Sequence, residues 1–132
     1  MIAFDTNVLV RLMVEDDEAQ TRSARDLLVR ATEGGERVLV TDIVLCELEW
    51  VLEAAYHVPR ESILRAIQAL CADDRFALQD PARTAGALSR CQAGRGDLSD
   101  YLPGLTAHPA GATTTYTFDR GLRTDEQFTV IR

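Results

Sequence analysis

The chain begins Met1-Ile-Ala-Phe-Asp5-Thr-Asn-Val-Leu-Val-Arg-Leu12, and this stretch sets the pattern for the rest of the sequence. Residues 2–4 form a short apolar run that ends at Asp5-Thr-Asn7, which predicts a buried first strand that stops at a polar turn. Residues 8–14 then have a helical pattern. The chain therefore opens with a strand, a turn that carries an acid, and a helix.

Strands and helices continue to alternate after this opening. Apolar spacing predicts helices over residues 16–31, 42–56, 60–70 and 81–91. Apolar or β-branched runs predict strands over residues 38–40, 76–78, 113–118 and 128–131. After Ser99, Pro103-Gly104 is expected to interrupt an apolar helical stretch. The sequence thus predicts an α/β fold in one domain, residues 1–132, with a central, mainly parallel sheet flanked by helices on both faces.

The composition indicates a globular domain: 132 residues, of which 46% are hydrophobic and 27% charged. The net charge of −7 argues against a broad basic surface, so a bound nucleic acid would have to be held by local arginines. All basic residues are arginine, which suits bidentate phosphate contacts and equally fits a compositional bias of the genome.

The cysteines and the first residues indicate where the protein acts. Cys46, Cys71 and Cys91 are odd in number and form no C-x-x-C pair, so neither a disulfide framework nor a zinc cluster is expected. The first residues lack a basic segment, and Asp5 and Arg11 break the apolar run, which argues against a signal peptide or a membrane span. We expect a cytoplasmic protein.

Two aspartates follow predicted strands directly. Asp5 follows the first strand and Asp119 follows residues 113–118. In a parallel α/β sheet the functional groups gather at the carboxyl ends of the strands, so both carboxylates are expected to face one crevice if both strands are central and parallel. The polar neighbours Thr6, Asn7 and Thr117 are candidates to orient ligands or metal-bound water.

Glu47 is the informative acid of the helix over residues 42–56. It falls on the border of the apolar arc, whereas Glu49 and Glu53 are expected to point away from it. A carboxylate at the rim of a core needs a partner, and a salt bridge to an arginine or a contact with a helix terminus is the alternative to a functional role.

Asp97 and Asp100 lie three residues apart at an expected helix start. Each, like Asp42, can serve as a helix cap, because helix starts attract acids. As a set, however, several carboxylates without nearby lysines repel one another unless divalent cations neutralise them. Mg²⁺ or Mn²⁺ suits such oxygen ligands, and a pair of these ions can catalyse phosphodiester hydrolysis.

Four motifs in order resemble PIN-domain proteins, specifically VapC-type toxins, over essentially the whole chain. They are Asp5-Thr-Asn-Val-Leu-Val-Arg-Leu12, Val44-Leu-Cys-Glu-Leu-Glu-Trp-Val-Leu52, Asp97-Leu-Ser-Asp100-Tyr-Leu102 and Thr117-Phe-Asp119-Arg-Gly-Leu122. The resemblance implies a PIN-like, Rossmann-like layered fold and a metal-dependent endoribonuclease that acts on RNA. It also implies a homodimer restrained by a cognate antitoxin, whose tail covers the acidic pocket.

On this resemblance the four acidic ligands are Asp5, Glu47, Asp100 and Asp119. Asp97 matches an acid often found three residues earlier and is the alternative third ligand. Such sequences usually continue as an alanine-rich helix after the third acid, but this chain has Tyr101-Leu-Pro-Gly104. Asp100 is therefore the least secure of the four.

Other side chains carry weaker indications. Surface or cap roles are expected for His57 and His108, because no nucleophile motif accompanies either. Trp50 and Tyr56 are candidates for the core, a dimer contact or the antitoxin groove. Arginines near the acidic motifs are candidates to hold RNA phosphates, although solvated or paired arginines are commoner; they are Arg11, Arg95, Arg120 and Arg123.

Two other functions stay open beside the ribonuclease. A haloacid-dehalogenase-like phosphohydrolase would also place Asp5 after the first strand, but Asn7 stands where its second aspartate would fall. A PIN-fold binding module with weak or no catalysis is the other alternative, given Pro103 after Asp100. No glycine-rich dinucleotide or ATP motif follows any strand.

Overall fold

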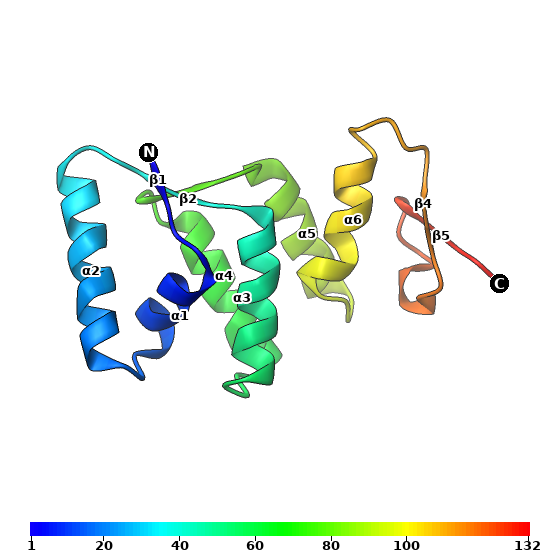
Figure 1. Ribbon diagram of the computed structural model, residues 1–132. Helices are drawn as coiled ribbons and strands as arrows, with labels where there is room; N and C mark the ends of the chain where they lie inside the picture. Colours follow the sequence, from blue (N-terminus) through cyan, green and yellow to red (C-terminus); the bar gives the residue numbers. More distant parts are fainter. The chain divides into compact units, whose positions relative to one another are not determined.

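The computed structural model describes residues 1–132 and divides into two compact units, Met1–Pro81 and Ala82–Arg132, each described here by itself. The first unit contains β1 (Ile2–Ala3), α1 (Thr6–Val14), α2 (Glu18–Glu33), β2 (Val38–Val40), α3 (Asp42–Ala54), α4 (Arg60–Ala72) and β3 (Phe76–Leu78). The second unit contains most of α5 (Pro81–Ala93), then α6 (Leu98–Ala107), β4 (Thr115–Thr117), the 3-10 turn η1 (Arg120–Leu122) and β5 (Phe128–Val130) (Figure 1).

Every strand pair is parallel, as the alternation of strands and helices predicts. In the first unit the order is β1-β2-β3, with Ile2 opposite Val38 and Val38 opposite Phe76. In the second unit β4 pairs with β5, with Thr115 opposite Phe128. The expected α/β class is confirmed, and the strand pairs form a three-stranded and a two-stranded group.

The core of the first unit surrounds the central strand β2. Val38 and Val40 are fully buried. They lie two residues apart on the strand, so their side chains point to the same face of the sheet. The rings of Phe4 and Phe76 meet edge to face, with centroids 6.4 Å apart. Around this sheet α1 packs against α2 and α3, and α3 packs against α4. The residues that follow β1 are thereby held in a fixed position.

Helix ends follow the sequence signals closely. Asp5, Asp17 and Thr41 are the N-caps of α1, α2 and α3, and each side chain accepts a hydrogen bond from a backbone N–H of the first turn. Gly34 ends α2, and Gly35 adopts a φ of +80°, which glycine tolerates without strain. The predicted boundaries therefore differ from the observed ones by only a few residues.

The expected interruption at Pro103-Gly104 is wrong. α6 runs without a break from Leu98 to Ala107 and includes both residues; Figure 1 draws it as one helix. Proline has a helical φ and removes a single N–H donor, while Leu98 and Tyr101 anchor the helix in the interior. A side chain at Gly104 would come within 2.9 Å of the Phe128 ring, so this glycine lets β5 approach α6 closely.

The buried arc of α3 also differs from the prediction. Glu49, expected to point away from the core, is only 5% exposed, whereas Val44 and Val51 are half-buried. The buried positions Leu45, Leu48, Glu49 and Leu52 share one helical face. The prediction used apolar residues only, so it counted Val44 and Val51 as buried and left out Glu49. A pattern based on hydrophobicity cannot include a buried carboxylate.

Candidate active site

Asp5 lies at the carboxyl end of β1, where the chain turns into α1. Its extended backbone, with φ −85° and ψ 178°, makes it the N-cap of α1, and one carboxylate oxygen accepts a hydrogen bond from the Val8 N–H at 3.3 Å. The residue is nevertheless exposed. The same aspartate therefore caps a helix and presents a carboxylate to solvent at the end of a strand.

Glu47 reaches this strand end from α3. The buried hydroxyl of Thr6 donates a hydrogen bond to Glu47 Oε2 at 3.0 Å, although the two residues are 41 positions apart in the sequence. Since Thr6 directly follows Asp5, the contact brings the carboxylate of α3 to the carboxyl end of β1. Glu47 therefore lies beside the Asp5-Thr-Asn7 turn within the first unit.

The electrostatic surroundings of Glu47 are strongly acidic. Burial, together with the negative charges of Glu49, Asp42 and Glu47, raises the pKa of the neighbouring Cys46 thiol to about 11. Cys46 is therefore a neutral thiol at physiological pH.

A groove runs from Asp5 between α1 and α2. It encloses about 500 Å³ and is lined on the α1 side by Asp5, Asn7 and Arg11 and on the α2 side by Gln20, Ser23 and Leu27, among others. Asn7 is exposed at its edge. The sequence singles out Asp5 and Asn7, but nothing in it indicates that α2 completes a wall beside them.

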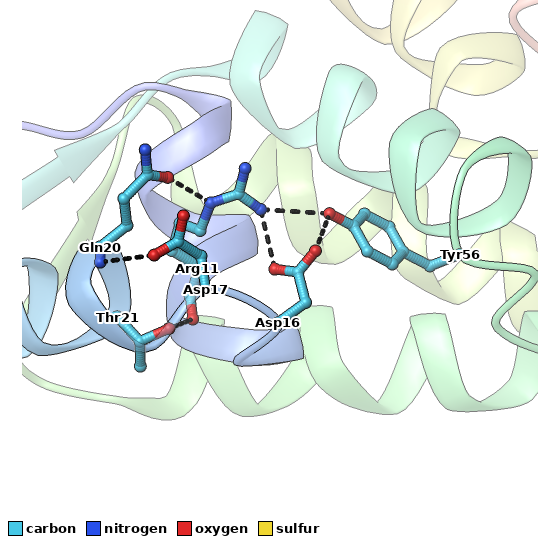
Figure 2. Close-up of polar contacts among 6 residues, drawn as sticks. All are labelled: Arg11, Asp16, Asp17, Gln20, Thr21 and Tyr56. Carbon is cyan, nitrogen blue, oxygen red and sulfur yellow. Dashed lines mark hydrogen bonds and ion pairs between the residues drawn. The ribbon is translucent and has the colours of Figure 1, made fainter.

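Arg11 is held by a network of side chains, which Figure 2 shows. Its Nη1 donates to Asp16 at 2.9 Å and to the Tyr56 hydroxyl at 3.1 Å, and Tyr56 in turn donates to Asp16 at 2.9 Å. Its Nε donates to Gln20 Oε1. The hydrogen bond with Tyr56 raises the pKa of the guanidinium, with Asp16 adding to the effect. The alternative of a paired arginine therefore describes Arg11, and Tyr56 serves this network.

In the second unit Asp97 and Asp100 occupy the start of α6. Asp97 is the N-cap, and its N–H donates to Asp100 Oδ2 at 2.8 Å in a capping box. The predicted capping role is therefore observed, and it occupies one oxygen of Asp100. Nearby Tyr101 is buried, and its ring packs so closely on Gly94 and Gly96 that a side chain at either glycine would overlap it.

Asp119 lies just after β4, as predicted. Its Oδ1 accepts a hydrogen bond from the Gly121 N–H at 2.8 Å, and its own N–H donates to Thr117 Oγ1 at 3.0 Å. Thr117 therefore fixes the backbone of Asp119. Both acids predicted to follow strands, Asp5 and Asp119, lie exposed at carboxyl strand ends within their own units.

The remaining candidate arginines lie on the surface. Arg95, Arg120 and Arg123 are exposed, and Arg123 donates to the Arg120 carbonyl at 3.0 Å. Within neither unit do three or more Asp, Glu, His or Cys side chains form a metal-binding group.

Residues 2–124 match the model of the PIN domain. The chain belongs to the PIN-domain family. PIN domains are generally nucleases that bind RNA and use divalent metals, so the family supports a nuclease function for this chain. No curated protein matches the chain at a significant level. No helix of this PIN protein combines the length and apolarity needed to cross a membrane.

Proposed function

We propose that this PIN protein is a metal-dependent endoribonuclease and the toxin of a toxin–antitoxin pair. Its proposed metal ligands are Asp5, Glu47, Asp100 and Asp119, with Asp97 as the alternative to Asp100. The observation that carries the proposal is the hydrogen bond between Thr6 and Glu47. It places Glu47 beside the turn that carries Asp5, so two distant motifs meet at one strand end, where parallel α/β proteins place their chemistry.

The donor chemistry of the first unit fits Mg²⁺ or Mn²⁺. The Asp5 carboxylate uses one oxygen for its cap, and the Glu47 carboxylate uses one for Thr6, so each retains an oxygen for a cation. Hard divalent cations prefer such oxygen ligands. When bound, they would supply the positive charge that activates water and stabilises the leaving oxygen during phosphodiester hydrolysis.

The chain's own residues would position the ligands. Thr6 orients the Glu47 carboxylate through its hydroxyl, and the N–H of Val8 orients Asp5. In the second unit Thr117 fixes the backbone of Asp119, and the capping box fixes Asp100. Hydrogen bonds of this kind restrict the rotamers of metal ligands and strengthen metal binding.

Exposed apolar surface supports the proposed partners, a second copy of the chain and an antitoxin. Ile43 and Trp50 are about 70% exposed and share one face of α3. A separate apolar groove of about 610 Å³ lies between α1, α2 and α4, with Leu12 and Val29 in its walls. Large exposed apolar patches commonly mark protein interfaces. Cys46, Cys71 and Cys91 are not joined in disulfides, which is in keeping with the proposed cytoplasmic location.

Cleavage assays separate the proposal from its alternatives. The purified protein is incubated with single-stranded and structured RNA in Mg²⁺, Mn²⁺ or EDTA, beside Asp5→Asn and the control Asp26→Asn, which alters an exposed acid of α2. Metal-dependent cutting that is lost only in Asp5→Asn supports the ribonuclease. Phosphatase activity without RNA cleavage would favour the phosphohydrolase, and an absence of both activities would favour a binding module.

A further inference from the structure

The groove between α1 and α2, defined above and called the α1–α2 groove, begins at Asp5 itself. Its volume of about 500 Å³ lies in the usual range for small-ligand sites. Its lining combines apolar side chains, such as Leu27, with the carboxamides of Asn7 and Gln20 and the hydroxyl of Ser23. A flat ligand with an apolar face and a polar edge matches this lining.

The charge of the groove favours a neutral group over a phosphate. Its only cation is Arg11, and the Asp16 carboxylate lies 2.9 Å from the guanidinium and neutralises it. Asp5 adds a negative charge at one end. A phosphate would therefore meet no unpaired positive charge here, whereas a nucleobase is neutral and carries hydrogen-bonding groups along one edge.

The network of Figure 2 fixes the direction of the Gln20 carboxamide. Arginine can only donate hydrogen bonds, so the Gln20 atom that faces Arg11 Nε must be the carbonyl oxygen. The amide nitrogen of Gln20 is then directed away from Arg11, as Figure 2 shows. Gln20 thus presents a donor whose orientation depends on Arg11, and Asp16 and Tyr56 hold Arg11 in turn.

We propose that the α1–α2 groove binds an unpaired nucleobase of the RNA, next to the phosphate that metal ions at Asp5 would hold. Gln20 Nε2 donates to an acceptor atom on the edge of this base. The inference rests on the proposed function, which makes RNA the substrate. It adds Gln20 as a residue that sets which base is preferred. Single-stranded RNA is commonly read in this way, through splayed bases whose edges are hydrogen-bonded.

The variant Gln20→Glu tests this contact directly. Glutamate retains an oxygen for Arg11 Nε, but it replaces the outward N–H donor with an acceptor. An acceptor there favours bases with an exocyclic amino group, such as adenine, over uracil, which has none. The control is Gln92→Glu, which adds the same charge at an exposed position of α5. Circular dichroism verifies that each variant is folded.

Binding is measured by fluorescence anisotropy with short oligoadenylate and oligouridylate in EDTA, and cut sites are then mapped in a random RNA with Mn²⁺. We expect the ratio of adenylate to uridylate affinity to rise about three- to tenfold in Gln20→Glu, as one hydrogen bond allows. It should not change in Gln92→Glu. The bases beside the cut sites should shift in the same direction.

Two results separate this inference from the proposed function. An unchanged affinity ratio in Gln20→Glu overturns the base-binding groove, even if all the proteins cleave RNA. A shifted ratio in a protein that never cleaves RNA upholds the groove and overturns the ribonuclease.

Discussion

The Thr6 hydroxyl lies 3.0 Å from Glu47 Oε2 and is buried beside the exposed carboxylate of Asp5. This contact joins the end of β1 to α3 across 41 residues. Replacing Thr6 by valine keeps the shape of the side chain and removes the donor. The contact therefore offers a way to test whether the orientation of Glu47 matters for function.

In Thr6→Val we expect the protein to stay folded and lose about 1 kcal/mol of unfolding free energy, the usual value of one hydrogen bond. The metal concentration that gives half-maximal RNA cleavage should rise about tenfold, because Glu47 loses its orienting partner. Urea unfolding and a Mn²⁺ titration of the cleavage rate measure the two effects. Thr32→Val is the control, since its hydroxyl binds only a carbonyl of α2. Equal metal requirements in both variants would contradict an orienting role.

Gly104 should be among the most sensitive positions of α6. A methyl group there would lie 2.8 Å from the Phe128 ring and 2.9 Å from Gln127, so Gly104→Ala should cost about 1–3 kcal/mol of unfolding free energy. At Gly86 of α5 the nearest atom would be Arg90 Nη1, 3.4 Å away and at an ordinary contact distance, so Gly86→Ala should be neutral or stabilising by up to about 1 kcal/mol. Urea unfolding of both variants checks the contrast, and similar values would mean that β5 does not pack against α6 in this way.

Tyr56→Phe removes the hydroxyl that links Arg11 and Asp16. We expect a loss of about 1 kcal/mol of stability, because two hydrogen bonds at a partly buried site disappear while the ion pair remains. Thermal unfolding measures the loss, and Tyr116→Phe, at a 68% exposed position, is the control. If the two variants unfold at the same temperature, the network contributes nothing to stability.

The pH dependence of stability should include a contribution from Asp73. Hydrogen bonds from Arg75 hold the pKa of this carboxyl below its ordinary value of 3.8. A carboxyl with a lowered folded-state pKa stabilises the protein above its unfolded-state pKa, and this stabilisation is lost as the pH falls through the folded-state value. Asp73→Asn should therefore be less stable than the wild type at pH 7 and equally stable in stronger acid. A difference that stays constant from pH 7 to pH 2 would rule out this linkage.

The sequence predicted the strands and the acids that follow them, because short apolar runs ending at Asp5 and Asp119 are local signals. It also predicted a capping role for Asp97 at the start of α6. It failed at Glu49, whose burial depends on what packs around α3, and at Pro103, which a buried, well-anchored helix accommodates.

The network of Arg11 could not be predicted from the sequence in the same way. Arg11, Asp16 and Gln20 are close along the chain, but Tyr56 reaches them from the end of α3, 45 residues from Arg11. No motif marks the α1–α2 groove, because its lining comes from the packing of two helices rather than from one segment. Such features appear only once the elements are placed in space.

The most direct test of the proposed function is to measure Mn²⁺ binding by electron paramagnetic resonance in the wild type, Asp5→Asn and Asp119→Asn. These variants alter one acid in each unit. If both acids serve the same ions, each substitution should weaken Mn²⁺ binding at least about tenfold, whereas Asp26→Asn should bind as the wild type does. Wild-type affinity in Asp119→Asn, or no Mn²⁺ binding by the wild type itself, would contradict a shared metal site.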